Sequence, residues 1–256
     1  RYCTNVAHIF ITCNENGALQ KMSGQPNILS LLLPKETNDL SLAMTSSFST
    51  MFITCVMLSH IHEIEAEASK IKAVAENAEY ILANCQKTLE EIANRGFERG
   101  IFLGSGQMKG IAEECHLKLQ ELTDGAVVCK FDSFLGFRHG PKAVVNGKSI
   151  VVYLTSDDEL VQRYERDLIR QIDGNNKVVA QVAVSQGEKI NVPVRFDAEI
   201  VMPNTTAKTG AYGCLPFVLV GQLLGFYTSV AHGLCPDAPS VSGNISRVVE
   251  GVTIYE

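Results

Sequence analysis

The sequence lacks any early apolar run long enough to predict a membrane-spanning helix. The most apolar stretch in the first part of the chain is residues 48–58, whereas a spanning helix needs about 20 residues. The first residues mix Arg1, Asn5 and His8 with apolar side chains and show no cleavage pattern of a signal peptide. We therefore expect no signal peptide and no membrane partner.

The sequence also lacks any run of lysine or arginine. Its 22 basic and 28 acidic residues give a formal net charge of −6. Proteins that bind nucleic acid carry basic patches that neutralise phosphates, so this balance argues against a nucleic-acid partner. It leaves room for a local positive pocket that binds one phosphate group.

The eight cysteines form no Cys-x-x-Cys pair. Zinc sites need Cys and His clustered at short spacings, so the sequence predicts no metal. His60 and His62 precede Glu63, but residues two positions apart do not share a helix face. Cys55 and Cys129 lie within apolar runs, which is typical of reduced, buried thiols in a cytoplasmic protein.

Two common functional motifs are missing as well. No complete Gly-x-x-x-x-Gly-Lys-Ser/Thr motif predicts a P-loop, because Gly147-Lys148-Ser149 has a lysine at position 142, where the first glycine would stand. No Gly-x-Ser-x-Gly predicts a nucleophile elbow. The turn Gly104-Ser105-Gly106 can present backbone N–H groups to an anion at the start of a helix. It lacks the third glycine of a dinucleotide fingerprint, and Ser105 suits a helix cap as well as a substrate contact.

The order of apolar segments predicts the fold. With 46% hydrophobic residues, the chain can bury a sizeable core, and after Gly96 strands that are apolar throughout alternate with helices. This alternation predicts an α/β fold of three layers, with a five-stranded parallel sheet between helices, of flavodoxin-like type. Strands are expected at 6–12 (buried), 28–33, 100–103, 127–131, 149–154, 178–184 and 198–202, and helices at 40–60, 61–94, 108–122, 157–172 and 215–232.

Three charged residues share one face of the helix expected after Gly106. Glu114, Lys118 and Glu121 stand at i, i+4 and i+7. A lysine flanked by carboxylates can hold a hydroxylated or anionic substrate while a carboxylate moves a proton between adjacent carbons. The alternative is a solvated face whose charges pair along the helix.

The loop from Asp132 to Pro141 follows an expected buried strand, and ligands in open α/β sheets bind at the carboxyl ends of strands. Its His139 is held by the stiff backbone of Gly140-Pro141 and follows Arg138. A histidine exchanges a proton near neutral pH, which suits the opening of a sugar ring. A structural histidine is the alternative interpretation.

Several of these segments together resemble proteins with sugar isomerase (SIS) domains. They are the strand with its Leu-Gly-Ser-Gly turn, the Glu-Leu-Thr-Asp-Gly helix end, the Gly-Phe-Arg-His-Gly-Pro loop and residues 244–249. The sequence is most similar to the tagatose-6-phosphate ketose/aldose isomerase group, also described as galactosamine-6-phosphate deaminase/isomerase. The resemblance covers essentially the whole chain. It implies the end of a first SIS domain with a linking helix at 1–72 and a complete second domain with a C-terminal tail at 73–256.

The resemblance also implies roles for individual residues. Glu121 would be the base that shuttles a proton between C1 and C2, with Glu114 also in the catalytic set, and His139 would open the ring, reaching a neighbouring subunit's site. The family has a lysine in the C-terminal tail near the position of Arg247, and arginine does not readily form a Schiff base. The residues expected to bind the sugar phosphate are Lys118, Gly104, Ser105, Gly106, Arg138, Thr45, Ser46, Ser47 and Arg247.

The family's Ser-rich phosphate loop, of the type Ser-Gly-x-Ser followed by Glu, does not occur in this chain. The family would place it before Arg1, so we expect further residues upstream. The resemblance predicts a cytoplasmic, homo-oligomeric isomerase that acts on a 6-phosphorylated hexose or hexosamine, with or without deamination, and needs no cofactor. The alternatives are a non-catalytic sensor of sugar phosphates and a structural partner subunit.

Overall fold

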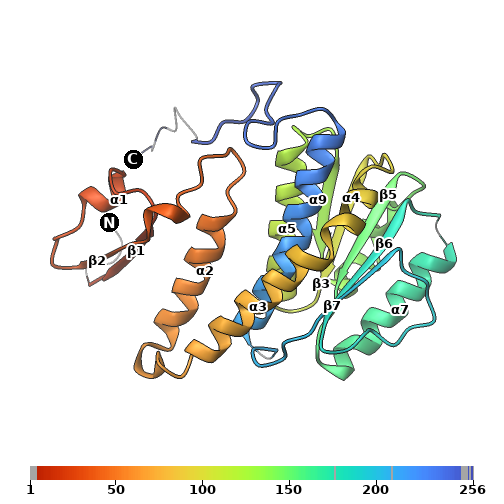
Figure 1. Cartoon of the computed structure of the whole chain (residues 1–256), viewed down its shortest axis with the longest axis horizontal. Helices are drawn as coiled ribbons and strands as arrows, with labels where there is room; N and C mark the ends of the chain where they lie inside the picture. Colours follow the sequence, from red (N-terminus) through yellow and green to blue (C-terminus); the bar gives the residue numbers. More distant parts are fainter. Residues whose placement is uncertain (1–4, 176, 209, 249–252, 254, 256) are drawn as a thin grey trace.

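The computed structural model describes residues 5–175, 177–208, 210–248, 253 and 255 of the chain. Arg1 and Val249, which the sequence analysis used, lie outside the described residues. The chain forms a small N-terminal lobe followed by a larger α/β unit, and the C-terminal segment runs back from the large unit toward the lobe (Figure 1).

The large unit is built on the expected parallel sheet. Its order is β4-β3-β5-β6-β7, which is the 2-1-3-4-5 order of flavodoxin-like folds. Every residue of β5 and β6 is buried, as expected for central strands covered on both faces. The strands are β3 (Arg99–Gly104), β4 (Val128–Asp132), β5 (Ser149–Leu154), β6 (Ala180–Gln186) and β7 (Ala198–Met202).

Helices cover both faces of this sheet, which confirms the three-layer fold. One hydrophobic cluster joins α4, α5 and α9 to one face, and a second joins α6 and α7 to the other. The helices are α3 (Ala68–Asn84), α4 (Gln86–Ala93), α5 (Met108–Leu122), α6 (Phe134–Phe137), α7 (Glu159–Asn175), α8 (Ala211–Cys214) and α9 (Val218–Ala231), with 3₁₀ turns η3 (Gly140–Val144) and η4 (Leu215–Phe217).

Helix α9 packs against α5 with unusually close backbones (Figure 1). A Cβ atom added to Gly221 would lie 2.5 Å from Cβ of Cys115, and one added to Gly225 would lie 3.0 Å from the carbonyl oxygen of Lys118. The two glycines are four residues apart and share one helix face. The absence of their side chains therefore fixes how closely α9 approaches α5.

The segment Ala211–Ala231, which spans α8, η4 and α9, is long and apolar enough to cross a membrane, and 61% of it is buried inside the protein. Its buried residues include Phe217, Val220 and Leu224, which belong to the core of the large unit. Packing in that core accounts for its apolar composition without a membrane.

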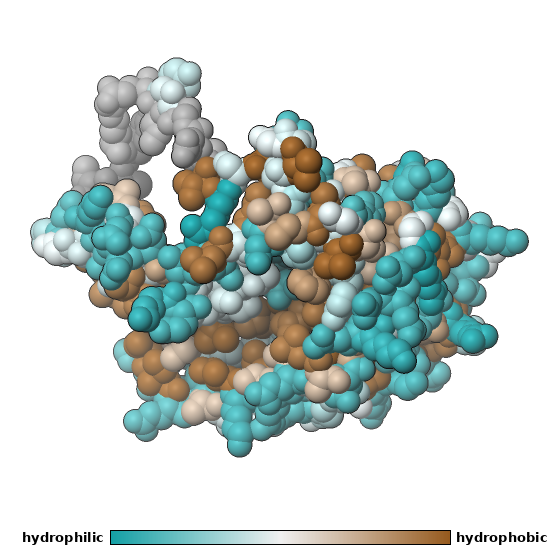
Figure 2. All heavy atoms as spheres, turned by 45° about the horizontal axis from the view of Figure 1, so that its top comes forward, coloured by the Kyte–Doolittle hydropathy of each residue, from teal (hydrophilic) through white to brown (hydrophobic). Residues whose placement is uncertain are grey.

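The N-terminal lobe differs from expectation in its burial. It contains β1 (His8–Thr12), α1 (Ala18–Lys21), β2 (Ile28–Leu32), η1 (Lys35–Thr37) and α2 (Ser46–Ser59). The strand expected to be buried is largely exposed, because β1 pairs in parallel with β2 alone within the described residues. Ile9 and Leu29 are about half exposed, and Figure 2 shows apolar side chains on the left half of the surface, where this lobe and α2 lie.

The long helix expected at 61–94 is also divided. A 3₁₀ turn, η2 (Ile61–Glu63), precedes α3, and the single residue Cys85 separates the end of α3 at Asn84 from the start of α4 at Gln86. The Asn77 side chain accepts a hydrogen bond from the Asn204 amide and donates one to the Asn204 carbonyl, which fastens α3 to the large unit. The domain boundary expected between residues 72 and 73 falls within α3, and it stays a proposal.

The close contact between α5 and α9 predicts unequal effects of two glycine substitutions. Gly221→Ala should destabilise the protein by about 2 kcal/mol or more, because the new Cβ overlaps Cys115. Gly110→Ala on the exposed side of α5, where an added Cβ meets nothing within 4 Å, should stabilise it by about 0.5–1 kcal/mol. Urea unfolding of both variants checks this, and equal effects would contradict the packing.

Candidate functional site

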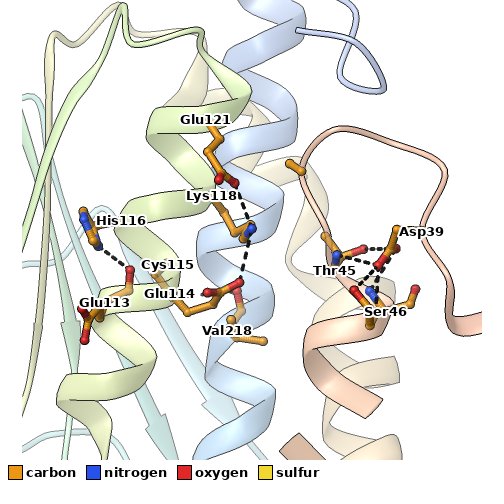
Figure 3. A network of polar contacts seen from close by, with 12 residues as sticks. Asp39, Thr45, Ser46, Glu113, Glu114, Cys115, His116, Lys118, Glu121 and Val218 are labelled. Atoms are coloured by element: carbon orange, nitrogen blue, oxygen red, sulfur yellow. Dashed lines mark hydrogen bonds and ion pairs between the residues drawn. The ribbon is translucent and has the colours of Figure 1, made fainter. Parts of the chain in front are cut away.

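The charged residues of α5 form a compact, buried cluster. Nζ of Lys118 lies 2.9 Å from Oε2 of Glu121 and 3.4 Å from Oε1 of Glu114, and all three side chains project from one face of the helix (Figure 3). Lys118 is only 5% exposed. The alternative of a solvated helix face is therefore wrong.

Burial changes the electrostatics of this cluster. Two carboxylates surround one ammonium group, so the ionised cluster carries a net charge of −1. Burial raises the pKa of Glu114, and the negative charge of Glu121 raises it further, while the charge and hydrogen bond of Lys118 act in the opposite direction. Glu114 therefore holds a proton more readily than an ordinary glutamate.

A pocket of about 500 Å³ opens beside Lys118 and Glu121. Leu42 and Met44, in the loop before α2, line its opposite side, and the C-terminal segment completes it with residues 244–247. Glu114 is absent from the lining, and its side chain is more buried than that of Glu121. The pocket thus presents one carboxylate and one ammonium, with the second carboxylate behind them.

Two polar contacts hold the C-terminal segment over this pocket. The amide and hydroxyl of Ser242 donate to the carboxylate of Asp124, at 2.7 and 2.8 Å. Arg247 donates to the side chain of Asn38, at 3.1 Å, and to the backbone carbonyl of Asp39. The structure therefore brings Arg247 to the pocket and engages its guanidinium with the loop that precedes α2.

The hydroxyl residues at the start of α2 are already bound to an internal anion. The Asp39 carboxylate accepts hydrogen bonds from the amides of Thr45, Ser46 and Ser47 and from the hydroxyls of Thr45 and Ser47, at 2.8–3.2 Å (Figure 3). Burial acts to raise the pKa of Asp39, but these hydrogen bonds outweigh it and lower the pKa. Sequence reasoning missed this role of Asp39, whose only signal was an acidic residue shortly before a Thr-Ser-Ser helix start.

The turn Gly104-Ser105-Gly106 lies at the other end of α5, away from Glu121. Gly104 is required because an added Cβ would lie 2.4 Å from the carbonyl oxygen of Met108, and Gly106 has a φ of +57°. Ser105 lies beside Glu165, whose pKa burial raises to about 7 despite the hydrogen bond that its carboxylate accepts from the Ser156 amide. The structure therefore separates this turn from the pocket near Glu121.

Arg138 and His139 are separated from Glu121 as well. Because α5 connects two parallel strands, it runs antiparallel to them, so its last turn and the segment after β4 lie at opposite ends of the sheet. The expected loop contains helix α6, whose buried Phe134 and Phe137 pack in the cluster under α7. His139 is exposed, and one chain does not bring it to Glu121.

Within the part of the chain that the structure describes, no three or more His, Cys, Asp and Glu side chains are grouped to hold a metal ion. The cluster on α5 contains two carboxyl groups and one ammonium group. Carboxyl groups suit proton transfer, and an ammonium group suits the binding of hydroxyl or anionic groups.

This chain is similar to known proteins over almost its whole length. A Streptomyces coelicolor protein provisionally named D-galactosamine-6-phosphate deaminase AgaS is 38% identical over 98% of this chain and 65% of its own length. The D-galactosamine-6-phosphate deaminase AgaS of a Shewanella species is 32% identical over 97% of this chain and 60% of its own length. No family model matches the chain.

A solved structure shares the fold closely. The crystal structure of a Clostridium novyi protein described as a candidate tagatose-6-phosphate ketose/aldose isomerase has a TM-score of 0.91 at 31% identity, covering 98% of this chain and 64% of that one. This chain shares its fold with these relatives, which supports its resemblance to the sugar isomerase (SIS) family and to proteins of the phosphosugar isomerase type. It spans 60–65% of the length of these relatives.

The Asp39 cluster predicts a pH-dependent contribution to stability. Asp39→Asn should destabilise the protein by about 1–3 kcal/mol at pH 7, because a charged acceptor of several hydrogen bonds is lost. The pKa of Asp39 is lower in the folded protein than its ordinary value of 3.8. Its stabilisation is therefore complete above that value and is lost as the pH falls through the folded pKa.

Urea unfolding at pH 7 and near pH 3 measures this difference. The gap between the wild type and Asp39→Asn should narrow at the lower pH. Glu36→Gln is the matched control, because Glu36 is an exposed acid of the same loop. A gap that stays constant with pH, or that the control reproduces, would rule out the proposed capping by Asp39.

Proposed function

We propose that the protein is a phosphosugar aldose–ketose isomerase that acts on a 6-phosphorylated hexose or hexosamine of the tagatose or galactosamine type, with release of ammonia when the substrate is an amino sugar. The observation that carries this proposal is the pocket in which Glu121 and the buried Lys118 face the C-terminal segment. The relatives' names, which refer to galactosamine 6-phosphate and tagatose 6-phosphate, support the substrate class.

Glu121 is the proton shuttle in this proposal. Its carboxylate takes the C2 proton of the open-chain amino sugar while the C1 oxygen gains a proton, which leaves an enolamine. The same carboxyl then returns its proton to C1, and C2 becomes a protonated imine, whose extra N–H proton restores the acid that protonated the C1 oxygen. Water adds to C2, ammonia leaves, and the product is the ketose. Glu121 suits this task because it lines the pocket and is the more exposed of the two carboxylates.

Lys118 and Glu114 act together in the proposed mechanism. A lysine ammonium has three N–H donors, and the two carboxylates occupy two directions around Lys118. The third N–H is left for an oxygen of the sugar in the pocket. Glu114 lies behind Lys118, so we assign it a positioning role: it holds the ammonium toward the pocket and offsets its charge.

His139 requires a second copy of the chain in this proposal. It is exposed, and it lies at the end of the sheet opposite to Glu121. We propose that the protein is a cytoplasmic homo-oligomer in which the partner places its own copy of this loop, with Arg138 and His139, at the pocket. There the histidine would carry the proton needed for ring opening.

Substitution of Glu121 tests the mechanism. Glu121→Gln should lower kcat for galactosamine 6-phosphate by about 100- to 10,000-fold with little change in fold, because a general base is removed while its volume is kept. Ammonia release and ketose formation are measured together. Glu113→Gln is the matched control, since Glu113 is an exposed neighbour on the same helix and should retain full turnover.

Two outcomes would contradict the proposal. Turnover by Glu121→Gln at the rate of the control would remove Glu121 from the chemistry. Binding of galactosamine 6-phosphate without turnover by the wild-type protein would instead indicate a sensor of sugar phosphates.

A further inference from the structure

A second pocket, of about 510 Å³, lies at the carboxyl ends of β5 and β6. Met108, the first residue of α5, lines it, whereas Glu121 stands near the other end of the same helix. With a rise of 1.5 Å per residue, these two positions are about 20 Å apart along the helix axis. The second pocket is therefore separate from the site of the proposed reaction.

The place and size of this pocket suit a small ligand. In open α/β sheets, ligands bind outside the carboxyl ends of the strands, and ligand pockets commonly measure about 300–1,000 Å³. Polar side chains line it where these strands end: Thr155 is 2% exposed, Ser185 is 6% and Gln186 is 7%. The Thr155 hydroxyl donates to the Val184 carbonyl at 2.9 Å, so it can still accept a hydrogen bond from a hydroxylated ligand, as can the amide oxygen of Gln186.

Contacts that reach residues outside its lining hold the pocket in shape. The buried carboxylate of Glu165 accepts a hydrogen bond from the Ser156 amide at 3.0 Å, and the side chain of Gln186 donates to the Asn204 carbonyl. Asp158 caps the start of α7 by accepting from the amides of Leu160 and Val161, at 2.8 and 3.1 Å. The N-terminus of α7 is thus occupied by a side chain, so an anion in the pocket must bind elsewhere.

The charges that line the pocket are of both signs. Arg166 pairs with Glu159 and Lys189 with Glu199, each at 2.6 Å. Among the described residues, Lys208 has no carboxylate within ion-pair distance, although it lines the pocket beside the turn at Gly187.

Two acidic residues of the lining also lack an ion-pair partner among the described residues. Asp157 and Glu188 line the pocket, and neither has a cation within ion-pair distance in the described part of the chain. One uncommitted ammonium and two uncommitted carboxylates in a polar pocket complement a ligand that carries an anionic and a cationic group.

We propose that this pocket is a second binding site, for a small phosphorylated amino sugar whose phosphate contacts Lys208 and whose ammonium contacts Asp157 and Glu188. Ser185, Gln186 and the neighbouring amide side chains bind its hydroxyl groups. The site does not depend on the proposed reaction, because it shares no lining residue with the pocket near Glu121.

Hydrogen–deuterium exchange of the full chain with galactosamine 6-phosphate tests the site. The Glu121→Gln background prevents consumption of the probe. The probe should slow exchange in residues 155–158 and 185–191. This protection should occur whether or not residues 114–121 and 242–247, which belong to the pocket near Glu121, are also protected. Lys208→Met should raise the probe concentration needed for this protection by about tenfold or more, because a charge-assisted contact is lost. Lys87→Met is the matched control, since Lys87 is exposed.

Two further probes separate the parts of the ligand. Galactose 6-phosphate, which lacks the amine, and galactosamine, which lacks the phosphate, should each protect these segments less, and Asp157→Asn should remove the preference for the amine. Thermal unfolding confirms that each variant is folded. If Lys208→Met does not fold, Asp157→Asn alone tests the site. Protection confined to 114–121 and 242–247, or equal protection by galactose 6-phosphate, would overturn the proposal, whether or not the enzyme turns over.

Discussion

The burial of the Lys118 ammonium between two carboxylates is the constraint on which the site depends. A buried charge is costly unless partners compensate it, and Glu114 and Glu121 provide the partners. The burial itself follows from the glycines of α9, since Gly225 lets that helix approach the backbone of Lys118. The packing of α9 against α5 thus sets the electrostatics of the adjacent face of α5. The same side chains on a less crowded helix would be an ordinary solvated face.

The site also depends on segments far from α5 in the sequence. The loop before α2 and the C-terminal segment form the opposite wall of the pocket, and Arg247 joins them to each other. Asp39 fixes the same loop to the start of α2 through its side chain, while its backbone carbonyl receives Arg247. One residue therefore ties together the lobe, the helix start and the tail.

Much of the fold was predictable because its signals are local. Continuous apolar strands and regular helices indicated the five-stranded sheet, and the bounds of α5 and β5 follow from their patterns. The burial of β1 was not predictable, because it depends on which strands pair with it. The triad at Glu114, Lys118 and Glu121 could be found from helical spacing, but its burial required knowledge of α9. The separation of His139 and Ser105 from Glu121 required the direction in which α5 runs between its strands. Asp39 stands in a cluster of helix-start residues, but its hydrogen bonds to residues 45–47 were not predictable because they bridge a loop without a regular period.

The contact of Arg247 with Asp39 has a consequence for the order of folding. The two residues are 208 positions apart, and the entropy lost on joining chain segments grows with the length of the loop between them. Contacts within the sheet and between α5 and α9 close shorter loops. They also bury more apolar surface, which offsets the entropy lost on closing those loops. The wall of the pocket is therefore expected to assemble after the core, so the charged cluster of α5 faces open solvent during folding and is enclosed only at the end.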